Sequence, residues 1–149
     1  MTARLALLLL ALATPALVQP ARSQPQVIST PDSPAAIGPY SQALRVGNTL
    51  YLAGQIALDP ATNQMISDRS IEAETRRVLD NLKAVVEAAG FRMSDIVTTT
   101  VFMADLNEFA RMNAVYATYF PTNPPARATV QAGRLPRDAK VEIVGIAAR

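Results

Sequence analysis

Residues 125–130, Pro-Ala-Arg-Ala-Thr-Val, and residues 140–147, Lys-Val-Glu-Ile-Val-Gly-Ile-Ala, have the pattern of two strands joined by a turn. In the second strand Glu142, Val144 and Ile146 share one face by strict alternation. Val141, Ile143 and Ala147 share the other face, so the strand is apolar on both sides, which is typical of a strand inside a sheet. Taking an ionised group out of water costs on the order of several kcal/mol. Glu142 therefore needs either a buried partner or a polar pocket.

Arg127 lies in the first of these strands, fifteen residues before Glu142. A guanidinium can hold an anionic substrate and a carboxylate can take a proton from water, so the pair could serve a hydrolase. The chain has no histidine and no cysteine, which excludes a Ser-His-Asp triad, a cysteine nucleophile, a Cys/His zinc site and disulfides. Two alternatives stay open: Arg127 as a surface arginine, and Glu142 in a buried structural ion pair.

Residues 1–23 predict a secretory signal peptide. Arg4 precedes an apolar run over residues 5–13, and Ala21-Arg22-Ser23 resembles a cleavage site. The run is too short to span a bilayer, which needs about 20 residues, so we expect no stable membrane insertion. The protein is therefore expected to be exported, either periplasmic or secreted.

Cleavage near Ser23 would leave twelve basic against twelve acidic residues. This balance offers no basic surface of the kind that phosphate binding needs, so we expect no nucleic-acid partner.

The chain after the signal predicts an extended lead-in over residues 24–39, rich in proline, and a single domain over residues 40–149. Gly47-Asn48 indicates a hairpin turn between two short strands. A helix is expected over residues 70–89, with Ser70 as its cap and Glu72 and Glu74 in its first turns.

A third strand is expected over residues 95–103, and Asp105 to Glu108 resemble a capping box before a second helix that ends at Tyr119. The order β-β-α-β-α-β-β then predicts an α+β fold, with a mixed sheet and two helices on one face.

Several short motifs follow one another along the domain. They are Ala35-Ala36-Ile37-Gly38-Pro39-Tyr40-Ser41-Gln42-Ala43, Gly54-Gln55, Leu79-Asp80-Asn81-Leu82 with Glu87-Ala88-Ala89-Gly90, Val101-Phe102 with Asp105-Leu106, Asn113, Pro125-Ala126-Arg127 and Val141-Glu142-Ile143. In this order they resemble the RidA (YjgF-type) family of reactive-intermediate deaminases, and the resemblance covers essentially residues 28–148.

The resemblance implies a chorismate-mutase-like fold in a homotrimeric barrel, with ligand sites at the subunit interfaces. It also implies hydrolysis of 2-iminobutanoate and 2-iminopropanoate to 2-oxo acids and ammonia, with no cofactor and no metal. By motif position, Arg127 would bind the substrate carboxylate and Glu142 would activate water. Tyr40 would close the pocket, the Gly54 backbone would contact the ligand, and Asn113 would help to bind the substrate.

Each of these residues also has a purely structural interpretation. Tyr40 could anchor a turn, Gly54 could mark a bulge or a close backbone approach, and Asn113 could be a solvated helix residue. The chain departs from the family in having Ala53 where well-studied members have serine, and Thr129 where many have cysteine. A non-catalytic trimer that binds small carboxylates or acts as a chaperone is the competing function, and an endoribonuclease is a more remote one.

Overall fold

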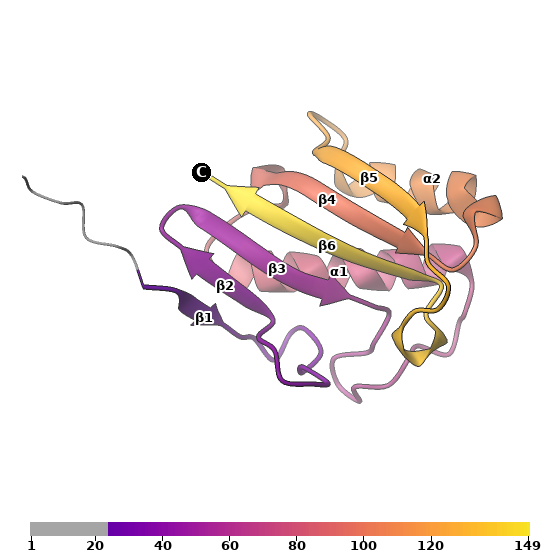
Figure 1. The fold of residues 1–149 in the computed structure, drawn as a ribbon, viewed down its shortest axis with the longest axis horizontal. Coiled ribbons are helices and arrows are strands. Elements are labelled where there is room, and N and C mark those ends of the chain that lie inside the picture. Colours follow the sequence, from indigo (N-terminus) through magenta and orange to yellow (C-terminus); the bar gives the residue numbers. More distant parts are fainter. Residues whose placement is uncertain (1–23) are drawn as a thin grey trace, which may run out of the picture.

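A computed structural model describes residues 24–149, and the signal peptide expected over residues 1–23 lies outside this range. The described chain folds around one mixed six-stranded sheet in the order β1-β2-β3-β6-β4-β5, in which only β4 and β5 run parallel. The longest strands stand at its centre, and β1 and β5 form its edges (Figure 1). The strands are β1 (Gln26–Ile28), β2 (Ala43–Val46), β3 (Thr49–Gln55), β4 (Ile96–Met103), β5 (Ala126–Gln131) and β6 (Val141–Ala148).

Two helices, α1 (Ile71–Ala88) and α2 (Phe109–Tyr119), cover one face of this sheet (Figure 1). Ser70 caps α1 as expected, because its side chain accepts a hydrogen bond from the Ala73 N–H. The apolar stripe of α1 faces the sheet and forms the core with alternate residues of β3, β4 and β6. The predicted fold class, α+β with two helices on one face of a mixed sheet, is confirmed.

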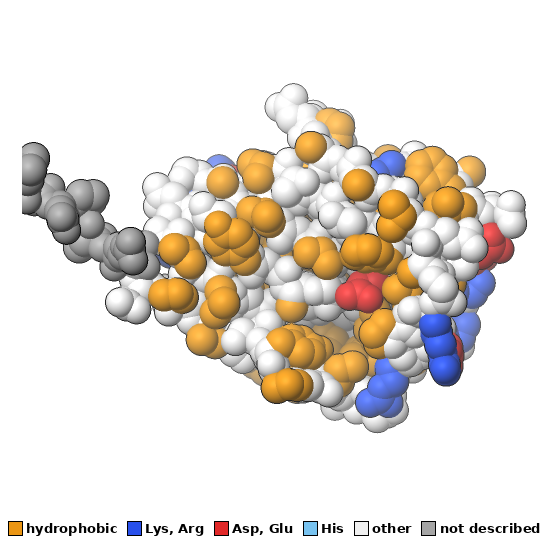
Figure 2. All heavy atoms as spheres, viewed as in Figure 1, with side chains coloured by type: hydrophobic (Ala, Val, Ile, Leu, Met, Phe, Trp, Pro, Cys, Tyr) orange, Lys and Arg blue, Asp and Glu red, His pale blue; other side chains and the backbone are white. Residues whose placement is uncertain are grey.

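The other sheet face carries no helix. Its strand residues are almost all apolar or small, and several are exposed, among them Leu44, Tyr51 and Val130. Figure 2 shows hydrophobic side chains spread over this open face. Of the three charged residues within strands, Arg45, Arg127 and Glu142, only Glu142 projects from it. A sheet face of this kind is normally covered by another layer.

The structure differs from the sequence expectation at two places. The proline-rich lead-in contains the edge strand β1, which pairs with β2, because an edge strand needs backbone partners on one side only. The capping box at Asp105 and Glu108 does not form as expected: Asp105 accepts from the Asn107 N–H, whereas Glu108 pairs with Lys140 and Arg111. A tertiary ion pair with Lys140 and a local one with Arg111 therefore replace the capping hydrogen bond at Glu108.

None of the helices within residues 24–149 is long and apolar enough to cross a membrane.

Candidate functional site

The predicted site residues gather in two separate hollows of the chain. The first, which we call the glutamate hollow, has a volume of about 310 Å³. The second, the arginine hollow, has a volume of about 380 Å³. The glutamate hollow is lined by Ile37, Tyr40, Ala53, Gly54, Ile56, Pro136 and Glu142, and the arginine hollow by Asn113, Tyr116, Ala117, Phe120, Pro124, Pro125 and Arg127.

Glu142 is half-buried in the middle of the open sheet face and makes no ion pair with any side chain of residues 24–149. Burial raises the pKa of Glu142 above its ordinary value of 4.5. A carboxylate with a raised pKa accepts a proton more readily than one in water. The structural alternative for this residue, a buried ion pair, is not formed within the described chain.

Gly54 lies directly against the Glu142 carboxylate. A Cβ at position 54 would overlap Oε1 of Glu142 and would lie 3.0 Å from its Cδ and 3.2 Å from its Cγ. The register between β3 and β6 also shifts between Leu52 and Gln55, which places Gly54 in a bulge. Glycine is needed here because the backbone must approach the carboxylate closely, as the strand glycine had indicated.

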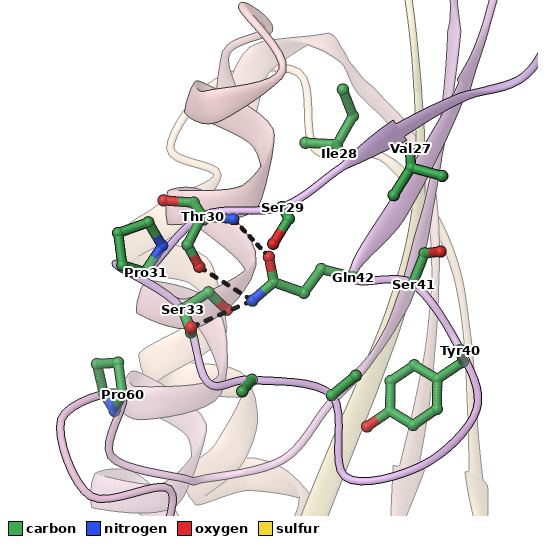
Figure 3. A pocket seen from close by; sticks show the side chains of 12 residues that line it. Val27, Ile28, Ser29, Thr30, Pro31, Ser33, Tyr40, Ser41, Gln42 and Pro60 are labelled. Atoms are coloured by element: carbon green, nitrogen blue, oxygen red, sulfur yellow. Dashed lines mark hydrogen bonds between the residues drawn. The ribbon is translucent and has the colours of Figure 1, made fainter.

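Tyr40 lies on the wall of the glutamate hollow, and its hydroxyl accepts a hydrogen bond from the Ile37 N–H at 3.2 Å. The residues that precede it are held by Gln42. The Gln42 amide donates to the carbonyls of Thr30 and Ser33 and accepts from the Thr30 N–H (Figure 3). It also donates to the carbonyl of Pro34. This buried amide therefore ties the lead-in to the start of β2.

The larger cavity beside Gln42, about 590 Å³, has no charged side chain in its lining (Figure 3). The polar groups in its walls are hydroxyl, amide and backbone groups. None of these carries a charge with which to hold an anion, and none is suited to act as a base. Within residues 24–149 no group of three or more acidic side chains is placed to hold a metal ion. A further hollow, of about 470 Å³, is lined by Arg76, Lys83 and Glu87, and there Lys83 pairs with Glu87. The glutamate and arginine hollows differ from it, because each holds a single charged side chain, and that side chain makes no ion pair among residues 24–149.

Arg127 is held flat by its neighbours in the arginine hollow. Its Cζ lies 4.5 Å from the ring centroid of Tyr116 and 5.6 Å from that of Phe109. Its Nη2 donates to Oδ1 of Asn113 at 2.8 Å. No carboxylate of residues 24–149 pairs with it. These contacts orient the guanidinium and leave its charge uncompensated, which suits a planar anion.

Tyr116 packs its ring against the Arg127 guanidinium. Its hydroxyl lies 2.7 Å from Oγ1 of Thr99. Burial raises the pKa of Tyr116, while the Thr99 hydrogen bond and the Arg127 charge lower it. Neither Tyr116 nor Phe109 was predicted to be a site residue from the sequence. Their spacing of seven residues, two helical turns, was the signal that both face the same neighbour.

Arg127 and Glu142 project from opposite faces of the sheet. Arg127 is in register with the buried Thr99 of β4, on the helix side, and Glu142 is in register with Phe102 on the open side. Thr99 is in turn paired with Gly145, three residues along β6 from Glu142. Arg127 and Glu142 are thus separated by roughly 10 Å along the strands and by roughly 10 Å across the sheet. They do not meet within one chain.

A family model described as Endoribonuclease L-PSP matches residues 30–149. The chain is 47% identical over 127 residues to the 2-iminobutanoate/2-iminopropanoate deaminase of Escherichia coli strain K12, covering 83% of this chain and 98% of that protein. The chain belongs to the RidA (YjgF) family.

Solved structures of the RidA family have the same fold as this chain. The YjgF gene product from E. coli is 47% identical with a TM-score of 0.79, and the match covers 83% of this chain and 98% of that chain. E. coli TdcF with bound serine is 42% identical with a TM-score of 0.79, covering 83% and 98% of the two chains. The predicted resemblance to the RidA fold is confirmed.

Proposed function

We propose that this RidA-family protein is a hydrolase that converts 2-imino acids of the 2-iminobutanoate and 2-iminopropanoate type to 2-oxo acids and ammonia. The observation that carries the proposal is the pair of uncompensated charges in the two hollows. Arg127 is oriented for a planar carboxylate, and Glu142 has a raised pKa suited to a base. The 47% identity to a protein named for this activity supports it.

The reaction needs one water molecule, both of whose protons end on the nitrogen. Water attacks C2 of the protonated imine, and one of its protons passes to the Glu142 carboxylate as the C–O bond forms. This proton then moves to the nitrogen, and the C–N bond breaks as ammonia leaves. The proton that remains on the hydroxyl group passes to the Glu142 carboxylate and on to ammonia, which leaves the 2-oxo acid and an ammonium ion. Arg127 holds the substrate carboxylate throughout by paired hydrogen bonds. The remaining walls of the glutamate hollow, including Ile37, Ala53 and Ile56, are apolar and suit a short aliphatic side chain.

The site is assembled between two copies of the chain in this proposal. Since Arg127 and Glu142 lie on opposite sheet faces, Arg127 and Asn113 would come from one copy and Glu142, Gly54 and Tyr40 from the next. The open apolar face supports such an assembly, because a second copy would cover it and would close the glutamate hollow. A homotrimer, as the family resemblance implies, is the assembly we propose.

Carboxylate binding without turnover is the alternative function. The structure of E. coli TdcF with bound serine favours it, because serine carries a carboxylate and no imine. RNA cleavage, which the family description suggests, is disfavoured by the absence of histidine and by the balance of basic and acidic residues after residue 23.

Imine hydrolysis by residues 24–149 tests the proposal. An amino-acid oxidase would generate the imino acid in place, and semicarbazide would trap what remains. We expect wild type to shorten the lifetime of the imine, and Arg127→Ala and Glu142→Gln to lose this effect. Arg76→Ala and Glu87→Gln on the surface of α1 serve as matched controls and should retain activity. Tight binding of 2-oxo acids with no turnover would instead favour the alternative.

A further inference from the structure

Helix α1 buries three polar side chains that the reaction does not use, and two of them bond to segments outside the helix, whereas Thr75 donates to the Ile71 carbonyl within it. Glu74 and Asn81 are 0% and 1% exposed. They stand seven residues apart, two helical turns, and therefore lie on the same side of the helix. Both reach loops that build the glutamate hollow.

Asn81 holds the segment that follows β3. Its Nδ2 donates to the carbonyl of Ile56 at 3.2 Å and to that of Leu58 at 2.9 Å. Ile56 is a wall of the glutamate hollow and also packs in a small apolar cluster with Leu135 and Ala139. Asn81 therefore holds the backbone at Ile56 and Leu58, and so holds the wall of the glutamate hollow that Ile56 forms.

Glu74 holds the segment that precedes β6. Its Oε2 accepts from the Lys140 N–H at 2.7 Å, two residues before Glu142. Its Oε1 pairs with Nε of Arg69 at 2.5 Å. Arg69 in turn donates from Nη2 to the carbonyl of Asp138 at 2.6 Å. One buried carboxylate therefore fixes the loop both directly and through the arginine fork.

The loop held in this way has an unusual backbone. Arg137 and Asp138 both have left-handed φ values, 57° and 54°, although neither is glycine. Side chains disfavour this region, and such residues persist where their surroundings impose the conformation. The turn places Pro136 in the wall of the glutamate hollow.

We propose that Glu74 and Asn81 are positioning residues, which hold the two loops so that Ile56, Pro136 and Glu142 keep the shape of the glutamate hollow. The ion pair of Glu74 is buried on the glutamate side only, since the Arg69 side chain is 40% exposed. An ion pair open to solvent on one side contributes little net stability, so we assign it a geometric effect. The consequence for turnover rests on the proposed function, whereas the consequence for the surroundings of Glu142 does not.

Three variants test this role. Glu74→Gln keeps the volume of the side chain, but an amide can accept at only one of the two positions where the carboxylate accepts. Arg69→Lys keeps a positive charge beside Glu74 but loses the fork that also reaches Asp138. Asn81→Leu removes both donors at similar volume. Glu72→Gln is the matched control, since Glu72 lies at the surface of the same helix and pairs with Arg111 of α2.

Two readouts are taken on each folded variant: steady-state kinetics with imino acids, and the pKa of Glu142 from carboxyl-carbon NMR. We expect kcat to fall on the order of tenfold to a hundredfold, as small misplacements of reacting groups do, with little change in KM. We expect the pKa of Glu142 to fall toward 4.5 as water enters the loosened hollow. Glu72→Gln should change neither quantity.

An unchanged kcat and an unchanged Glu142 pKa in the folded variants would overturn the proposal. An equal loss in Glu72→Gln would also overturn it, because the effect would then be one of general stability. If Glu74→Gln does not fold, the kinetics and the Glu142 pKa of Arg69→Lys decide the positioning role. That variant keeps a positive charge beside the buried Glu74 carboxylate. If wild type shows no turnover, the proposed function fails, and the Glu142 pKa alone still decides the positioning role.

Discussion

Arg127 and Glu142 leave the same sheet on opposite sides, Arg127 toward α2 and Glu142 toward the open face. Each is oriented by its own neighbours, Arg127 by Asn113 and Tyr116, and Glu142 by Gly54. A reaction that uses both residues therefore requires two chains, and this leads to the first of five predictions.

Mixed assemblies of two inactive variants should regain activity. In an assembly of Arg127→Ala and Glu142→Gln chains, some interfaces combine the intact arginine of one chain with the intact glutamate of the other. Random assembly from equal amounts should restore about a quarter of wild-type activity, because about one interface in four receives both intact residues. The measurement is imine hydrolysis after co-expression of the two chains. Absence of any recovery in verified mixed oligomers would place the site within one chain.

Gly54→Ala should abolish most of the activity. The new Cβ overlaps the Glu142 carboxylate, so the carboxylate must move away from its place. A loss of at least tenfold in kcat is expected from such a displacement. Gly133→Ala is the matched control, because its Cβ would meet no atom within 4 Å. Equal kinetics for the two variants would contradict the close approach of Gly54 to Glu142.

Arg127→Lys should raise KM despite the retained charge. Lysine cannot form the bidentate contact with a carboxylate or stack in the same way on Tyr116. We expect KM to rise about tenfold to a hundredfold, the equivalent of one charge-assisted hydrogen bond. Arg76→Lys, on the surface of α1, should leave KM unchanged. A normal KM in Arg127→Lys would show that simple charge suffices for binding.

Glu142→Gln should change stability in a pH-dependent way. The folded-state pKa of Glu142 is raised by burial, so the folded chain binds a proton more tightly than the unfolded chain. Wild type therefore loses stability as pH rises from about 4.5 through the raised pKa. Above this window Glu142→Gln should be the more stable protein by about 1 kcal/mol or less, because the carboxylate is only half-buried. Below it the difference should vanish.

Thermal melts at pH 4 and pH 7 measure this difference in stability. The kinetic counterpart is an acid limb of kcat/KM with a midpoint above 4.5, because the base must be deprotonated. A larger stability gain for Glu142→Gln at the lower pH would be inconsistent with burial as the cause of the shift.

Export of the protein is the fifth prediction, which follows from the sequence of residues 1–23. The mature chain should begin near residue 24 and should be found outside the cytoplasm. N-terminal sequencing after cell fractionation checks both points, with a chain lacking residues 2–23 as the control. Recovery of the full-length chain in the cytoplasm alone would contradict it. If the protein is exported, we propose that its imines arise outside the cytoplasm, from oxidation of amino acids.

Local patterns were enough to predict most of the elements. The alternation in residues 141–147 placed Glu142 on one face and the core residues on the other, as observed. Ser70 and the stripe from Ile71 to Ala89 located α1 to within about one residue, because capping and helical periodicity act over neighbouring residues. Gly54 was expected at a bulge or a close approach, and both are present.

The burial of Glu74 could not be predicted in the same way. In the sequence it stands beside Glu72 in the first turn of α1, where both carboxylates suit the helix dipole. In the structure Glu72 is at the surface and Glu74 is fully buried against Arg69 and Lys140. Its partners lie 5 and 66 residues away, and only the folded chain brings the more distant one to it.

The sequence by itself determined the order of the elements from β2 to β6, the alternation of faces along each of these strands and the identity of the unusual charges. These depend on periodicities of 2 and 3.6 residues that are local to the chain. The tertiary structure alone decided that Arg127 and Glu142 point away from each other. That result depends on the register of β5 and β6 on either side of β4, and a shift of one residue in either pairing would have reversed it.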